Sequence, residues 1–385
     1  MKVSLHRYHD KSWDSPPDSS MDTSQTLVII FAAARPGPAL LSELSNLHTI
    51  YPRSVLIGCS SSGEIYGEEL NDDSIVLAVV QLEDTRLRQV NYPIDDAAHS
   101  ATAGKILAEQ LRADDLVAVF TLTDGLLVNG STFVDALSGT LPEGVVVTGG
   151  LAGDGDRFEK TWVLFDGEAK PGQATAVGLY GDKVRVSHGS RGGWDLLGPA
   201  REVTRAEGNI LYTLDNQPAL QVYKKYLGDR ADGLPATGLL FPLAINNEEE
   251  TDGLTVRTIL AVDEQKQSIT FAGDIPEGCS VHLMRANFDR LVDGAAAAAE
   301  SVKLDDYPGG PALCVAISCV GRRLVLGPRA EEEIEAVSES LPTDVQQIGY
   351  YSYGEISPLA SGRCDLHNQT MTLTMIWETE QCTDC

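Results

Sequence analysis

The sequence predicts a mixed α/β fold in two domains, with layered sheets flanked by helices and built from repeated strand-helix-strand units. The first observation is a repeated pattern, I-G-x-x-S-x-G-E-I, which occurs at 57–65 and again at 348–356. The second is a shared order of segments: an apolar strand, a loop, an amphipathic helix, a second strand and a Gly-rich turn follow one another three times. The third is that the strands are apolar on both faces, which is typical of sheets covered on both sides.

Three units are predicted, and they begin at TLVIIFAA, LVAVFTLTDG and ALCVAISCVG. Similar intervals separate the first strand of each unit from its Gly-rich turn: Leu27 to Gly58, Leu116 to Gly149 and Ala312 to Gly349. Local signals support the helices predicted between the two strands of the second and third units. Ser131 is predicted as an N-cap, and the acidic residues 331–333 favour a helix N-terminus. Pro142 and Pro342 are predicted to end the helices that precede them. Duplicated supersecondary units are therefore expected.

Other elements lie between the second and third units. We expect a strand at 209–214, a turn at 215–218, a helix that Gly228 ends, strands at 254–262 and 268–274, and a helix at 287–302 with one apolar face. The domain boundary is placed at the turn. The predicted segments are a flexible N-terminus at 1–25, domains at 26–216 and 217–378, and a flexible tail at 379–385 that holds Cys382 and Cys385.

Composition excludes several functional classes. A formal net charge of −27 and an excess of 56 acidic over 29 basic residues disfavour binding to nucleic acid or to an anionic membrane surface. The longest apolar run, at 27–34, is far shorter than the roughly 20 residues that a spanning helix needs. Because the N-terminus lacks the continuous apolar segment of a signal peptide, we expect a cytoplasmic protein.

Candidate ligand contacts follow the apolar strands, because the loops at strand ends are the usual binding site of an open α/β sheet. Glycines there allow close backbone approach, and the polar side chains offer donors and acceptors. The alternative is that these glycines only make tight turns. The predicted ligand-binding residues are Ser60, Ser61, Glu64, Asp124, Asn129, Asp154, Arg191, Trp194, Tyr353, Glu355, His367 and Asn368.

Common enzyme signatures are absent. The chain has no Walker A lysine, no dinucleotide fingerprint that opens a helix, no G-x-S-x-G elbow and no H-E-x-x-H. The remaining catalytic hypothesis uses Cys59 as a nucleophile with His188 or His367 as its base. The tail pair Cys382 and Cys385 forms a C-x-x-C that suits a disulfide or half of a zinc site, and we favour a redox-sensitive end.

Six motifs together resemble the FIST proteins, which contain FIST N and FIST C domains: GCSSSGEI, TDGLLVNG, GGLAGDG, SRGGWDLLGP, the run VTRAEGNILYTLDNQPALQVYKKYLG, and YYSYGEISP followed by LHNQTMTLT. The resemblance covers residues 27–378. It implies an intracellular sensory module that binds a small ligand, and amino-acid-like ligands are proposed for the family. It further implies that the signal passes to a histidine kinase or a cyclic-di-GMP enzyme. We expect a sensor without catalytic activity.

A chain of this size also resembles the nitric-oxide-sensing haemoproteins of that family. This resemblance implies haem b with a histidine as axial ligand, for which His367 is the first candidate and His188 the second. Any haem would be bound without a covalent link, because the sequence has no C-x-x-C-H.

Overall fold

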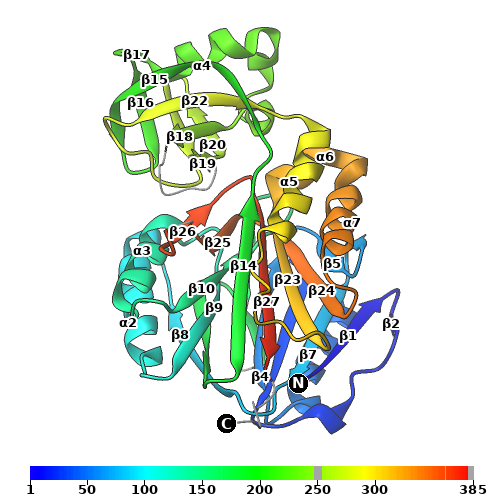
Figure 1. The fold of residues 1–385 in the computed structure, drawn as a ribbon. Coiled ribbons are helices and arrows are strands. Elements are labelled where there is room, and N and C mark those ends of the chain that lie inside the picture. Colours follow the sequence, from blue (N-terminus) through cyan, green and yellow to red (C-terminus); the bar gives the residue numbers. More distant parts are fainter. Residues whose placement is uncertain (166, 247–253, 360, 380–385) are drawn as a thin grey trace.

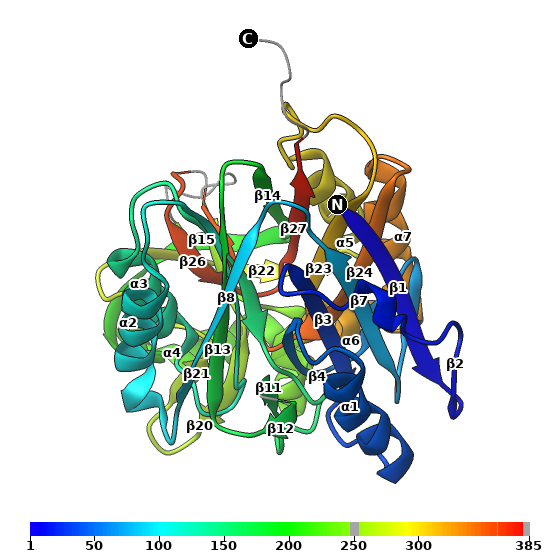
Figure 2. The same cartoon turned by 90° about the horizontal axis from the view of Figure 1, so that it is seen from below.

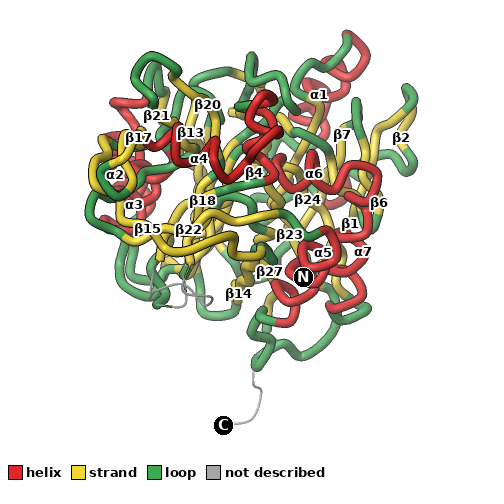
Figure 3. The backbone as a smooth tube through the Cα atoms, turned by 90° about the horizontal axis from the view of Figure 1, so that it is seen from above, coloured by secondary structure: helices red, strands yellow, loops and turns green. Residues whose placement is uncertain are grey.

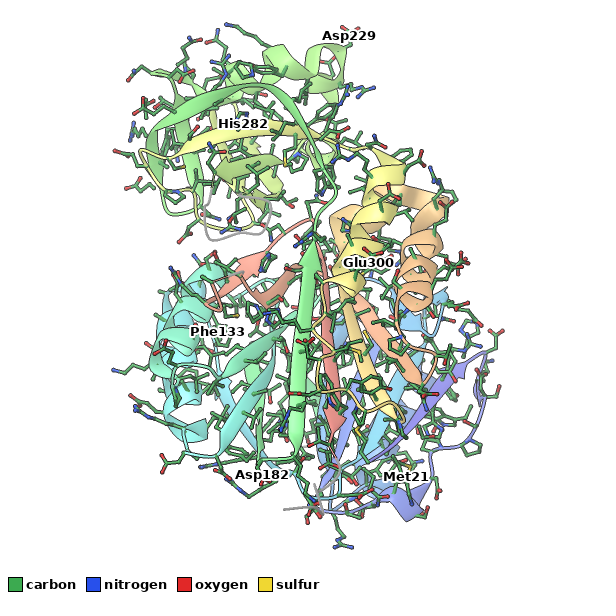
Figure 4. All side chains as sticks on the ribbon, in the orientation of Figure 1. Met21, Phe133, Asp182, Asp229, His282 and Glu300 are labelled. Carbon is green, nitrogen blue, oxygen red and sulfur yellow. The ribbon has the colours of Figure 1, made fainter. Side chains whose placement is uncertain are left out.

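A computed structural model describes residues 1–165, 167–246, 254–359 and 361–379. Three sheets form a large body, and a fourth sheet forms a small lobe at one end of it (Figure 1). Asp229 and His282 mark the small lobe, and Met21, Phe133 and Asp182 mark the large body (Figure 4). Cys382 and Cys385 lie outside the described residues.

The large body confirms the three repeated units. Each unit has two parallel strands joined through helix, and a third strand that pairs antiparallel with the first. Their bounds are β3 (Thr26–Ala33), α1 (Pro38–Ile50), β4 (Val55–Ser61) and β7 (Ile75–Gln81); β9 (Leu116–Thr123), α3 (Gly130–Thr140), β10 (Val146–Leu151) and β13 (Gln173–Tyr180); β23 (Ala312–Cys319), α6 (Val320–Leu326), α7 (Ala330–Ser340), β24 (Val345–Ser352) and β27 (Met371–Glu378).

The three sheets exchange strands in a cycle. The strand that follows each Gly-rich turn leaves its own unit and pairs with the second strand of another unit. Thus β5 (Glu64–Tyr66) pairs with β24, β11 (Val163–Phe165) with β4, and β25 (Gly354–Pro358) with β10. The repeated turns are therefore crossing points between sheets, which locks the units together.

A shared core lies between the three sheets, whose arrangement is seen from below in Figure 2. Phe31, Phe120 and Tyr350 come from different units and meet there, with the Phe31 and Tyr350 rings stacked 4.4 Å apart. The outer faces are covered by helices: α1 on the first sheet, α2 (Ser100–Leu111) and α3 on the second, and α5 (Phe288–Glu300) and α7 on the third. Strands apolar on both faces are thus explained.

Outer strands extend each unit, and one of them corrects the expectation of a flexible N-terminus. β1 (Lys2–His9) pairs with β7 over seven residues and buries His6 and Tyr8. Its alternating side chains give it one buried face, which the polar composition of 1–25 conceals. The equivalent strands are β8 (Arg86–Pro93) on β13 and β14 (Val184–Arg191) on β27.

The small lobe is inserted between β14 and α5 and contains its own core around Leu211, Tyr223 and Phe271. Figure 3 shows its strands lying across the end of the large body. Its elements are β15 (Asp195–Glu207), β16 (Ile210–Leu214), β17 (Gln217–Pro218), α4 (Ala219–Leu227), β18 (Leu243–Asn246), β19 (Leu254–Arg257), β20 (Ile259–Asp263), β21 (Ser268–Phe271) and β22 (Ser280–Arg285). The predicted boundary turn lies inside this sheet, between β16 and β17. The predicted strand at 254–262 is divided into β19 and β20.

Short strands complete the sheets: β2 (Ser12–Trp13), β6 (Glu69–Asn71), β12 (Glu168–Lys170) and β26 (Cys364–His367). Among the described residues, no helix is both long and apolar enough to cross a membrane.

Candidate functional site

A hollow of about 550 Å³ lies where the small lobe meets the large body, and we call it the interlobe hollow. Both parts of the structure line it. The large body contributes β14, the connection that follows it, α5, the end of β26 and the segment before β27, and the small lobe contributes β15, β19 and β22. The lining residues are Ser190, Arg191, Gly192, Gly193, Trp194, Leu196, Leu254, Val256, Met284, Arg290, His367 and Thr370.

The connection between β14 and β15 shapes this hollow. Gly193 has φ +80°, and a Cβ there would lie 2.1 Å from the Arg290 carbonyl oxygen, so only glycine allows this close approach. Trp194 is buried, and its Nε1 donates to the Gln369 carbonyl at 2.8 Å. A buried guanidinium, Arg322, donates to the carbonyl of Gly192. The lobes are therefore joined by an ordered connection.

Charge and apolar surface are separated within the interlobe hollow. Arg191 and Arg290 supply positive charge, and Arg290 also pairs with Asp195 at the edge. Leu254, Val256 and Met284 supply an apolar wall. This arrangement suits a small molecule with an anionic group and an apolar part, because guanidinium groups bind carboxylates through paired hydrogen bonds.

Only some of the predicted residues meet here: Arg191, Trp194 and His367 line the interlobe hollow. Ser61 and Glu64 line a different hollow of about 850 Å³, together with Asp72 and Arg323. The two copies of the repeated pattern therefore do not converge on one ligand position, because β5 and β25 cross into different sheets.

Several predicted residues use their polar groups to hold loops. The Ser60 hydroxyl accepts a hydrogen bond from the backbone N–H of Trp162 at 3.1 Å. Asp124 accepts from three backbone N–H groups, those of Leu126, Leu127 and Gly172.

Asp154 accepts from the backbone of residues 158, 159 and 160 and from the Tyr353 hydroxyl. Asn129 caps α3 by accepting from the Thr132 N–H at 3.1 Å, so the prediction of Ser131 as the N-cap was wrong. Its Nδ2 also reaches Asp274 of the small lobe at 3.3 Å. These side chains maintain the loops around the hollows.

The repeated glutamates, Glu64 and Glu355, occupy equivalent buried positions. Ser74 donates through both its N–H and its hydroxyl to Glu64, at 3.2 and 2.8 Å. Ser352 and the Thr370 N–H donate to Glu355 at 2.6 and 3.2 Å. Burial raises the pKa of Glu64 to about 7 and that of Glu355 to about 8. Each carboxyl thus fixes the start of the third strand of its unit.

Stability is expected to fall as pH rises from about 5 to about 8, in part through Glu355. Its folded pKa lies above its unfolded value, so the folded chain holds an extra proton in this window and loses that advantage as pH rises. Glu355→Gln keeps the shape of the protonated carboxyl and should flatten this fall. Urea unfolding midpoints across the window measure it.

The control for this prediction is Glu335→Gln, an exposed glutamate on α7. This variant should keep the slope of the wild-type chain. An unchanged slope in Glu355→Gln would contradict the role assigned to its buried carboxyl.

Asn368 is buried beside His367. Its Nδ2 donates to the His367 carbonyl at 2.9 Å, and its Oδ1 makes no hydrogen bond with the described part of the chain. Such a buried acceptor is a place for an ordered water or for a ligand donor.

The structure removes the physical basis for Cys59 as a nucleophile. Its side chain is fully buried in the core between the sheets, and burial raises the pKa of its thiol. A nucleophilic cysteine needs an accessible, stabilised thiolate. The enzyme hypothesis therefore loses its support.

The two histidines predicted as haem ligands lie at neighbouring hollows. His367 lines the interlobe hollow, its side chain is buried, and its Nε2 lies 3.0 Å from the Ser357 carbonyl oxygen. His188 lines a neighbouring hollow, and burial, followed by the charges of His367 and Lys303, lowers its pKa to about 4. Within the described ranges, no cluster of three or more His, Cys, Asp or Glu is arranged to hold a metal ion.

The sequence analysis did not identify the apolar residues of the small lobe that line the interlobe hollow, nor Arg290. Leu196, Leu254, Val256 and Met284 look in the sequence like ordinary strand residues, and no local pattern says which of them face another lobe. Arg290 lies in the first turn of a helix that was predicted, yet its orientation depends on Asp195.

The fold and hollow define a two-part, mixed α/β protein with a ligand-sized hollow between its parts. A FIST N domain model matches residues 26–217, and a FIST C domain model matches residues 219–358. The chain therefore belongs to the FIST family, whose domains are associated with the sensing of small ligands in signal transduction.

The chain is also similar to MJ1623, an uncharacterized protein of Methanocaldococcus jannaschii. The two are 23% identical over 396 residues, which cover 92% of this chain and 74% of that protein.

Proposed function

We propose that this chain is a sensor that binds a small, amino-acid-like anion in the interlobe hollow. One observation supports the proposal most: the hollow is lined by two arginines, Arg191 and Arg290, and by an apolar wall from β19 and β22. A carboxylate would pair with the guanidinium groups, and an apolar side chain would lie against the wall.

Such a ligand would contact both parts of the chain. A ligand shifts a conformational equilibrium only through different affinities for its two states. Because the hollow is lined from both sides, ligand contacts would favour the arrangement in which the small lobe and the large body are close. This is the physical basis on which binding would become a signal.

The signal would pass to a separate partner, for which a histidine kinase or a cyclic-di-GMP enzyme is the class that the family resemblance implies. The ligand-bound chain would change the rate of that enzyme, and the ligand-free chain would not. A cytoplasmic location is part of the same proposal.

Arg290→Gln is expected to weaken ligand binding about tenfold or more, because a hydrogen bond between charged groups is lost. The twenty L-amino acids and hexanoate would first be screened by the thermal shift that each gives the full chain. Isothermal titration calorimetry would then compare the best probe on the wild-type and variant chains.

Arg285→Gln is the matched control. Arg285 is as exposed as Arg290, at 59% against 57%, and also lies near Asp195, but it does not line the hollow. If Arg285→Gln weakened ligand binding as much as Arg290→Gln does, the proposed site would be contradicted. If no probe binds but added haem gives a sharp Soret band that His367→Ala abolishes, the chain is a haem sensor and the ligand class proposed here is wrong.

A further inference from the structure

A second hollow, of about 320 Å³, adjoins the first, and we call it the basic hollow. It lies between the edge strand β14, the end of β25 and the residues that follow α5. Its lining residues are Ser187, His188, Gly189, Ser190, Arg191, Ser301, Lys303, Pro358, Leu359 and Gly362.

The basic hollow is lined by positive charge, although the chain as a whole is acidic. Acidic residues outnumber basic ones by 56 to 29, yet the described residues that line this hollow include Arg191, Lys303 and His188 and no carboxylate. Three serine hydroxyls complete the polar lining. Lys303 is exposed, and none of the ion pairs among the described residues involves it. Its charge is therefore available to a bound group.

The fold holds these groups together tightly. A Cβ at Gly189 would lie 2.1 Å from the Ala298 carbonyl oxygen, so β14 packs directly on α5. This contact brings Ser301 and Lys303, just beyond α5, beside His188. Burial, and after it the positive charge of nearby Lys303, lowers the pKa of His188 to about 4. A bound anion would oppose this shift, because it favours the protonated ring.

We propose that the basic hollow binds a compact oxyanion, a carboxylate or phosphate group, through Lys303, Arg191, His188 and the serine hydroxyls. Ser190 and Arg191 line both hollows, so the oxyanion would be a second anionic group of the molecule bound in the interlobe hollow. Only this last assignment to one molecule rests on the proposed function. Charge-assisted hydrogen bonds to an oxyanion are the chemistry on which the site depends.

Inorganic phosphate is the probe, compared with chloride at equal ionic strength so that screening is the same. Two-dimensional NMR of the seven histidine rings would follow the ring of His188, identified by its loss in His188→Gln. Phosphate should raise the pKa of His188, because a nearby anion favours the imidazolium. Lys303→Gln should weaken this response about tenfold.

Lys105→Gln, an exposed lysine on α2, is the matched control and should respond like the wild-type chain. The inference would be overturned if phosphate left the pKa of His188 unchanged, or if it raised that pKa equally in Lys303→Gln. The ring of His188 is the readout because phosphate also stabilises proteins without binding a site, so a gain in stability would not be specific. If an amino acid still binds through Arg290, the proposed function survives that result. If phosphate binds through Lys303 but no amino acid binds, the proposed function fails and the anion site stands.

Discussion

Arg322→Met is expected to lower the free energy of unfolding by about 3–5 kcal/mol, because it leaves Glu333 as an uncompensated buried charge. Both side chains are fully buried, and the guanidinium donates twice to the Glu333 carboxylate, at 2.8 and 2.6 Å. The same guanidinium donates to the carbonyls of Gly192 and Leu291. Its loss would also loosen the connection that shapes the interlobe hollow. Urea unfolding followed by far-UV circular dichroism measures the change.

Arg329→Met is the control for this prediction. Arg329 pairs with Glu332 and Asp289 at the surface, where ion pairs contribute at most about 1 kcal/mol. The double variant Arg322→Met with Glu333→Gln should recover part of the loss, because the buried charge is removed. A cost for Arg322→Met as small as that of Arg329→Met would show that the buried pair does not support the fold as described.

Gly349→Ala is expected to destabilise the chain by about 3 kcal/mol or more, because its Cβ has no room. The new carbon would lie 1.8 Å from the Ala316 carbonyl oxygen on the neighbouring parallel strand. Gly58 and Gly149 are in the same situation, with distances of 2.4 Å to Ile30 and 1.8 Å to Thr121. The repeated glycine is thus explained by close strand packing at each crossing point. Thermal and urea unfolding of the three single variants measure it.

Gly139→Ala supplies the contrast for the same substitution. Gly139 lies in α3, and an added Cβ would meet nothing within 4 Å. Alanine there should stabilise the helix by about 0.5–1 kcal/mol. If Gly349→Ala were also neutral or stabilising, the close approach of β23 and β24 would not be what requires the glycine.

Sequence order alone determined the repeated units, because hydrophobic periodicity and glycine position are local properties. The strands β3, β9 and β23 are each predicted this way, as are the helices α1, α3 and α7. The short helix α6, directly after β23, was not predicted. The motifs also identify the family, because each of them is a run of adjacent residues. Patterns fixed within about forty residues are therefore readable in this chain.

Tertiary structure decided where the repeated loops go and which residues meet. Glu64 and Glu355 share one motif, yet strand exchange sends them to different sheets. Arg290 and Lys303 line adjoining hollows because α5 packs on β14, and nothing in their neighbours along the chain records that contact. The sequence predicted Arg191, Trp194 and His367 as ligand contacts, and all three line the interlobe hollow. The residues that face them across the hollow are brought there by packing between distant segments, which leaves no local signal, so only the tertiary structure identifies them.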